Sequence, residues 1–276
     1  MSTLALPGPA PADLRFHPLR DSATMLRRNL RRAVRYPSLT LIVAGMPIVF
    51  LLLFVFVFGG TLGAGLGGTS GGRAEYVNFV TPGILLIGVA GAAQGTAITV
   101  AMDMQEGIIA RFRTMSIARG SVLTGHVLSS LVQTMIGLAV VVAVALLTGF
   151  RPSAGVTEWI AVAAVLAMAT VALVWVSVAM GLVARSVESA SNMPMLLTLL
   201  PFFGSGFVPT ESMPAGLRTF AEYQPFTPVM DTVRGLLLGT PIGNSGLLAV
   251  AWCTGISAFG YVWARRSYER RPARQP

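Results

Sequence analysis

Long apolar stretches alternate with shorter polar segments along the chain from residue 39 onward. A membrane-spanning helix needs about 20 mostly apolar residues. Five stretches meet this requirement clearly: residues 39–58, 80–102, 121–148, 158–183 and 247–264. A sixth stretch, residues 193–208, is shorter and contains Pro194 and Pro201. The pattern therefore predicts an all-α integral membrane protein with five or six spans.

The distribution of arginine decides between these two counts. Lysine and arginine concentrate on the cytoplasmic side of membrane proteins, close to the ends of the spans. With six spans, sixteen of the 20 arginines fall on one side, in the leader, in segments 103–120 and 184–192, and in the tail. With five spans, the arginine-rich tail would lie on the opposite side and the asymmetry would be lost. We therefore predict six transmembrane helices with both termini in the cytoplasm. The predicted regions are a leader over residues 1–38, a six-span membrane domain over 39–264 and a basic tail over 265–276.

Residues 19–36 of the leader show helical periodicity. Leu19, Leu26 and Leu30 fall on one stripe, whereas arginines fill the flank and the opposite face. Pro37 ends this pattern before the first span. We interpret it as an amphipathic helix in the plane of the lipid headgroups. A solvated charged helix is the alternative.

The segment 209–245 is too long to be structureless in a compact protein. Met213, Leu217 and Phe220 share one helical face, and the same spacing recurs after Pro228. We therefore predict two short external re-entrant helices before the last span. In the second of them Asp231 and Arg234 stand one helical turn apart and can pair. The prolines of this external motif are Pro209, Pro214, Pro225 and Pro228.

The composition agrees with a membrane protein and excludes several other classes. Hydrophobic residues make up 54% of the chain and charged residues 11%, with a mean hydropathy of +0.70, whereas a soluble domain carries about 25% charged residues. All 20 basic residues are arginine, so a lysine-dependent P-loop is impossible in this chain. The single cysteine, Cys253, and two histidines argue against a metal site. The net charge of +9 follows from the arginines on one side of the membrane and needs no nucleic-acid partner.

The predicted spans contain almost no ionisable side chain. His126, near the cytoplasmic end of the third span, is the exception, and we interpret it as an interfacial residue. Proton-coupled transporters usually keep titratable groups inside their spans, so an energy source in another subunit is favoured. Gln94 and several aromatic residues are candidates for a substrate path, with bonding to a neighbouring helix, packing or lipid contact as the alternatives. The aromatic candidates are Phe54, Phe58, Phe202 and Phe203, with Phe56 and Phe207 beside them.

The segment 103–120 between the second and third spans mixes charged and apolar residues. It begins with Asp103 and Glu106, which we expect beside a water-facing loop. A short helix here would present charge and apolar side chains to the cytoplasm and would suit a docking surface. An ordinary solvated loop is the alternative.

Two runs of sequence carry a family resemblance. Residues 207–231, followed by Arg234-Gly-Leu-Leu-Leu-Gly239, lie just before the last span, and Glu106-Gly-Ile-Ile-Ala-Arg111-Phe112-Arg113 lies between the second and third spans. Both resemble the type-2 ABC transporter permeases, specifically the daunorubicin/doxorubicin-resistance class. The likeness covers nearly the whole chain, and its C-terminal run is the most specific part.

The resemblance implies a permease subunit of an ATP-driven exporter that moves an amphipathic drug or lipid-like molecule out of the cell through the plasma membrane. It implies a separate nucleotide-binding subunit, which binds ATP and Mg, and a pair of permeases, here expected to be a homodimer. We expect no cofactor, metal or catalytic site in this chain. The residues expected to couple it to the ATPase are Glu106, Arg111, Phe112, Arg113 and Met115. The alternatives are a passive channel or membrane scaffold, and a proton-coupled exporter.

Overall fold

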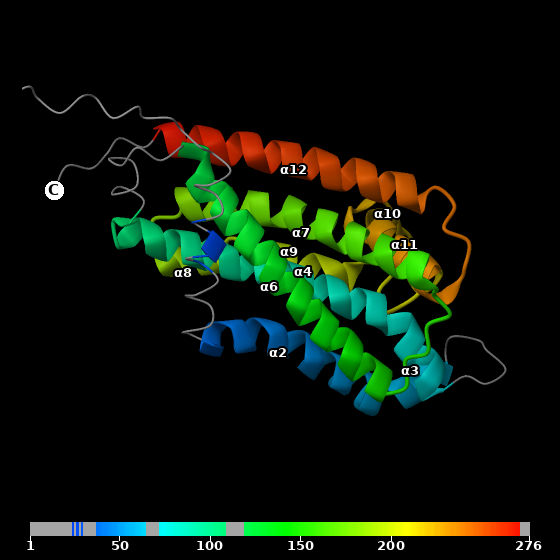
Figure 1. Cartoon of the computed structure of the whole chain (residues 1–276). Coiled ribbons are helices and arrows are strands. Elements are labelled where there is room, and N and C mark those ends of the chain that lie inside the picture. Colours follow the sequence, from blue (N-terminus) through cyan, green and yellow to red (C-terminus); the bar gives the residue numbers. More distant parts are fainter. Residues whose placement is uncertain are drawn as a thin grey trace, which may run out of the picture.

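The computed structural model of the chain describes residues 37–64, 72–108 and 119–270, together with Thr24, Leu26, Arg27 and Asn29 (Figure 1). These four leader residues are helical, and the rest of the expected amphipathic helix lies outside the described residues. Every regular element within the described ranges is a helix, as the apolar pattern predicts.

Within these ranges, five helices are long and apolar enough to cross a membrane. The first is composite, because α2 (Pro37–Leu53) continues through a π-helical turn, η1 (Phe54–Phe58), into α3 (Gly59–Ala64). The other four are α4 (Arg73–Gln105), α6 (Arg119–Leu147), α7 (Val156–Val183) and α12 (Ser245–Arg270). Each of the five clear apolar stretches of the sequence thus falls on one of these candidate membrane-spanning helices, and α4 extends beyond the predicted 80–102 at both ends.

The long helices lie side by side, and α2, α4, α6 and α7 alternate in direction, whereas α12 runs parallel to α7 (Figure 1). α2 and α6 begin at the end of the bundle where α4, α7 and α12 finish. We call this the arginine-rich end, since it holds Arg265, Arg266 and Arg270 of α12. We call the opposite end, where α3 lies, the α10–α11 end after the two short helices found there.

The sixth expected span, residues 193–208, does not form a single helix. Over residues 187–203 the chain makes three short helices, α8 (Val187–Asn192), α9 (Met195–Leu199) and the 3-10 helix η2 (Leu200–Phe203). Pro194 precedes α9 and Pro201 lies in the first turn of η2, and a proline has no N–H to donate to the preceding turn. The expectation of one continuous helix is therefore wrong. We call residues 187–207 the broken segment.

The two short helices predicted before the last span are present. They are α10 (Ala215–Tyr223) and α11 (Phe226–Leu238), and a 3-10 turn, η3 (Thr210–Ser212), precedes them. Pro209, Pro214 and Pro225 each stand directly before one of these elements, and Pro228 is buried in the first turn of α11. A proline suits the start of a helix because its φ angle is already helical and no N–H is needed there. Gly239 ends α11 with a φ of +70°, a left-handed conformation that glycine adopts at little cost.

α4 is the central helix of the bundle. It contacts α2, α6, α7, α8 and α11. Apolar side chains are fully buried along its length, from Tyr76 through Leu85 and Ala93 to Val100. The core is therefore built around the second predicted span.

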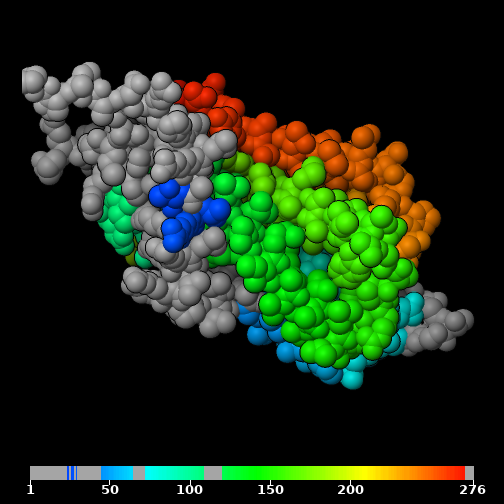
Figure 2. All heavy atoms as spheres, in the orientation of Figure 1, coloured from blue at the N-terminus to red at the C-terminus, as the bar shows by residue number. Residues whose placement is uncertain are grey.

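α6 by contrast covers one face of the bundle (Figure 2). Leu128, Val132, Ile136 and Val140 follow one another at intervals of four residues, and all four are exposed. Residues four apart share one face of a helix. This apolar stripe is the surface expected of a helix that contacts lipid.

Candidate translocation and coupling sites

The broken segment runs antiparallel to α4. Gln94 Nε2 donates a hydrogen bond to the carbonyl oxygen of Ser191 at 3.0 Å. Further along, the Tyr76 hydroxyl donates to the carbonyl oxygen of Phe207 at 3.5 Å. Later residues of the broken segment therefore pair with earlier residues of α4. The chain after α7 thus travels from the arginine-rich end toward the α10–α11 end.

Two glycines allow the broken segment to approach α4 closely. A Cβ atom on Gly83 would lie 3.0 Å from the Cα and carbonyl oxygen of Gly206, and a Cβ on Gly206 would lie 2.9 Å from the Cα of Gly83. On the other side of the same turn, a Cβ on Gly204 would lie 2.9 Å from Gln224 Nε2 and 3.0 Å from Thr227 Oγ1. The turn 204–206 is thus held tightly between α4 and the start of α11.

Aromatic side chains connect the first composite span to the end of the broken segment. The ring centroid of Phe54 lies 4.8 Å from that of Phe207, and Phe50 lies 5.5 Å from Phe202. Phe202 stacks on Phe207 with centroids 5.0 Å apart, and Phe58 lies 5.8 Å from Phe54. We call these five residues the aromatic cluster. It brings together three of the predicted path residues, Phe54, Phe58 and Phe202.

The other two predicted path residues lie apart from this cluster. Phe203 is exposed, and the Gln94 amide is bonded to the broken segment, which is the alternative role considered for it. Phe50 is a cluster member that the sequence analysis did not single out. The sequence feature that could have identified Phe50 is the spacing of four residues, which places Phe50, Phe54 and Phe58 on one face of the helix. The role of these residues in transport stays a prediction.

A largely buried arginine joins three elements near the α10–α11 end. Arg234 Nη1 donates to Asp231 Oδ1 at 2.8 Å, which confirms the predicted pair. Arg234 Nη2 donates to the carbonyl oxygens of Ser205 at 2.6 Å and Phe79 at 3.3 Å. The Ser205 hydroxyl also donates to Asp231 Oδ1 at 2.6 Å, and the guanidinium lies 4.3 Å from the centroid of the Phe79 ring. These contacts tie α11 to α4 and to the broken segment.

Burial and pairing act in opposite directions on Arg234. Its side chain is 15% exposed, and burial lowers the pKa of the guanidinium while the Asp231 carboxylate raises it. Arg218 in α10 is exposed, and its hydrogen bond to Glu222 raises its pKa. A buried charge is tolerated when it is paired and hydrogen bonded. Nη1 and Nη2 of Arg234 meet this condition, whereas its buried Nε has no hydrogen-bond partner among the described residues.

Of the predicted coupling residues, the structure describes Glu106, which lies at the arginine-rich end. α4 ends at Gln105, and Glu106 is exposed directly after it. The other coupling candidates, Arg111, Phe112, Arg113 and Met115, lie outside the described residues. α6 begins at Arg119. α4 and α6 therefore flank the segment that carries these candidates.

Two ionisable side chains at the same end are buried. The sequence analysis expected Asp103 beside a water-facing loop, but α4 continues past it to Gln105 and its carboxylate lies against His126 of α6. Asp103 is 1% exposed and His126 is 4% exposed, and His126 Nε2 lies 3.4 Å from Asp103 Oδ2. Further along the same interface the Thr96 hydroxyl donates to the Ser130 hydroxyl at 2.7 Å. The sequence does contain a signal for this interface, because its polar residues have helical spacing. Thr96 and Asp103 are seven residues apart on α4, and His126 and Ser130 are four residues apart on α6.

Comparison with known proteins identifies the family. The model of the ABC-2 type transporter family matches residues 21–238. The chain belongs to this family. The daunorubicin resistance ABC transporter permease protein DrrB1 of Streptomyces coeruleorubidus is 28% identical over 218 residues, which are 79% of this chain and 75% of that protein. The probable doxorubicin resistance ABC transporter permease protein DrrC of Mycobacterium tuberculosis is 26% identical over 175 residues, which are 59% of this chain and 62% of that protein.

Membership of the ABC-2 family fixes the general role of the chain. It is a multi-pass membrane protein and the permease subunit of an ABC exporter. The family also implies an ABC ATP-binding partner. The helices, the aromatic cluster and the Arg234 network are therefore parts of a transport subunit.

Proposed function

We propose that this permease exports an amphipathic drug-like or lipid-like molecule, driven by ATP hydrolysis in a separate subunit. The similarity to permeases named for daunorubicin and doxorubicin resistance supports this substrate class. A chain without lysine cannot form a lysine-dependent P-loop. ATP and Mg would accordingly be bound by the partner.

The aromatic cluster is the observation that carries this proposal. It offers apolar ring faces from two separate parts of the chain, one on η1 and one at the end of the broken segment. Ring faces of this kind suit flat or chain-like apolar molecules. Phe54 and Phe58 belong to a π-helical turn, and such turns are frequent at functional sites. The cluster would border the substrate path, and α10 and α11 would cap it as re-entrant helices.

The broken segment would supply the sixth crossing of the membrane. Its antiparallel contacts with α4 support this topology, because they carry the chain from one end of the bundle toward the other. An interrupted helix is tolerated in a membrane where other helices satisfy its backbone. Six crossings would leave both termini in the cytoplasm, as the arginine distribution predicts.

Coupling to the ATPase would take place at the arginine-rich end. Arg111, Phe112 and Arg113, with Glu106 and Met115 beside them, would contact the partner. α4 and α6 flank this segment and would carry its movement into the bundle. Two copies of the permease would pair as a homodimer around one substrate path in the plasma membrane.

Transport in vesicles tests the proposal. The permease would be co-expressed with its ABC ATP-binding partner and reconstituted, and both ATP turnover and vesicle accumulation of doxorubicin would be measured. We expect the drug to stimulate ATP turnover and to accumulate only with ATP. A partner that binds but does not hydrolyse ATP is the control and should abolish accumulation. Drug movement without ATP would favour a passive channel, and movement that follows an imposed proton gradient without the partner would favour proton coupling.

A further inference from the structure

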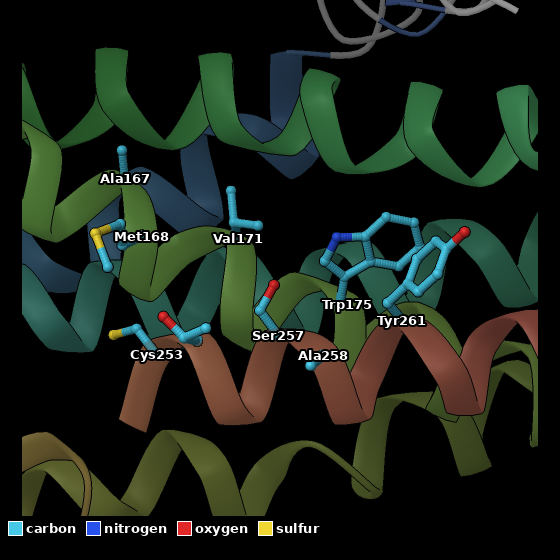
Figure 3. Close-up of a pocket in the computed structure, with 9 residues that line it drawn as sticks. Ala167, Met168, Val171, Trp175, Cys253, Ser257, Ala258 and Tyr261 are labelled. Carbon is cyan, nitrogen blue, oxygen red and sulfur yellow. The ribbon is translucent and has the colours of Figure 1, made fainter. Parts of the chain in front are cut away.

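A groove of about 530 Å³ runs along the seam between α7 and α12 (Figure 3). Met168, Val171 and Trp175 line it from α7, and Ser257, Ala258 and Tyr261 line it from α12. Both helices belong to the long apolar helices of this membrane protein. The groove therefore lies at the depth of the bilayer rather than in water.

Close helix contact and two aromatic rings define the shape of the groove. A Cβ atom on Gly260 would lie 2.7 Å from the backbone nitrogen of Val176 and 2.9 Å from the Cβ of Trp175, so α12 touches α7 directly beside the groove. The rings of Trp175 and Tyr261 meet edge to face, with centroids 5.1 Å apart. These two are the lining residues furthest along α7 and α12, and both helices finish at the arginine-rich end (Figure 1). The groove thus extends from the middle of the bundle to an aromatic pair.

A cation follows the aromatic pair on the same face of α12. Thr254, Ala258, Tyr261 and Arg265 are spaced by four, three and four residues, which places them on one helical stripe. Arg265 is 64% exposed, and its Nε donates to Glu269 at 3.1 Å. A guanidinium has five N–H donors, so the bond to Glu269 leaves donors for another acceptor.

We propose that this groove binds an anionic phospholipid, with one acyl chain along the seam between α7 and α12 and the phosphate at Arg265. The apolar walls match an acyl chain, and tryptophan and tyrosine are common at the depth of the membrane interface. Charge complementarity selects the headgroup, because arginines near a bilayer surface attract anionic lipids. The inference requires only that the chain spans a membrane and does not depend on the substrate or direction of transport.

Fluorescence of Trp175 reports directly on the groove. Trp159, Trp252 and Trp263 would be replaced by phenylalanine, and the full chain would be placed in phosphatidylcholine vesicles. A rising fraction of lipid with brominated acyl chains would be added, as either phosphatidylglycerol or phosphatidylcholine. Bromine quenches tryptophan only at short range. We expect half-maximal quenching at a mole fraction of phosphatidylglycerol about fivefold lower than that of phosphatidylcholine, which is the preference that one arginine near the surface provides.

Matched variants separate the headgroup contact from the groove itself. Arg265→Gln should remove the preference for phosphatidylglycerol, whereas Arg266→Gln, which removes the same charge one residue off the stripe, should keep it. Glu269→Gln should keep or raise the preference, because Arg265 remains and loses a competing carboxylate. Ala258→Phe should reduce quenching by both lipids by filling the groove. Gly255→Phe adds the same bulk on another face of α12, where a Cβ has no neighbour within 4 Å. This variant should leave quenching by both lipids unchanged.

Several results would overturn the proposal. Equal quenching by the two lipids in the parent would mean unselective contact with the surrounding bilayer. Absence of quenching would mean that another part of the assembly, such as a second copy of the chain, covers the groove. An equal effect of Arg265→Gln and Arg266→Gln would remove the headgroup site. If the triple tryptophan substitution impairs insertion, the difference between these two arginine variants in the chain with all four tryptophans gives the same test.

Discussion

His126 Nε2 lies 3.4 Å from Asp103 Oδ2, and this pair joins the two helices that flank the predicted coupling segment. Both side chains are almost completely buried. Ionisable groups inside a membrane protein are costly and usually pair with one another. The pair is therefore a buried polar contact that holds α4 against α6, at the end of the bundle where the ATP-binding partner is proposed to dock.

The first prediction concerns this pair. Asp103→Leu removes the carboxylate, keeps most of the volume and leaves His126 without its acidic neighbour. We expect a loss of about 3 kcal/mol in the free energy of unfolding, since removing one partner of a buried pair is strongly destabilising. Denaturant unfolding in detergent would measure the loss. Glu269→Gln is the control, because it breaks a pair that is exposed and should change stability little. Equal stability of Asp103→Leu and the parent would contradict the structural role of the pair.

The second prediction concerns the contact between Gly83 and Gly206. An alanine at position 206 would place its Cβ 2.9 Å from the Cα of Gly83 and 2.8 Å from the sulfur of Met230. The backbone of α4 or of the turn must then move, and we expect a cost of about 1–3 kcal/mol in unfolding free energy. Gly255→Ala is the matched control, since nothing lies within 4 Å of its Cβ position. Destabilisation of both variants to the same extent would show that the close approach is not responsible.

The third prediction concerns the docking of α11. Arg234→Gln removes the guanidinium contacts with Asp231, Ser205 and Phe79. Hydrogen bonds to charged groups contribute about 1.5–3 kcal/mol, so amide hydrogen exchange in α11 should become at least about tenfold faster. Arg218→Gln removes the exposed pair with Glu222 in α10 and should leave exchange in α11 unchanged. Unaltered exchange in the Arg234 variant would mean that apolar packing alone holds α11.

The fourth prediction concerns coupling to the ATPase. Replacing both Arg111 and Arg113 with glutamate reverses the charge of the proposed docking surface. We expect the permease to remain inserted, but ATP hydrolysis to be uncoupled from export. The ratio of drug exported to ATP hydrolysed in vesicles measures this. The control reverses Arg73 and Arg218, two exposed arginines at the α10–α11 end. Unchanged export by the Arg111 and Arg113 variant would refute the docking assignment.

Much of the fold follows from local properties of the sequence. The five clear spans need only length and apolar character, and Pro214 and Pro225 mark the starts of α10 and α11 because proline suits a first helical turn. The pairing of Asp231 with Arg234 is also local, since it depends on residues three apart in one helix. These features could be predicted because no distant contact decides them.

The remaining features depend on contacts between distant parts of the chain. The broken segment is bonded to α4 near both of its ends, at Ser191 by Gln94 and at Phe207 by Tyr76, and the apolar pattern does not reveal these contacts. Asp103 looked water-facing because the apolar stretch ended at residue 102, yet α4 continues by three residues and buries it. The aromatic cluster likewise joins residues about 150 positions apart. Sequence patterns identified most members of these sites but not which of them meet.

The most direct test of the topology asks where the tail lies relative to the turn before α10. Single cysteines would be placed at Glu211 and Gln275 in a chain carrying Cys253→Ser, and intact cells would be treated with a maleimide that does not cross membranes. If the broken segment supplies the sixth crossing, Glu211→Cys will be labelled in intact cells and Gln275→Cys only after permeabilisation. Labelling of Gln275→Cys from outside intact cells would contradict a cytoplasmic tail and the placement of the ATPase contact.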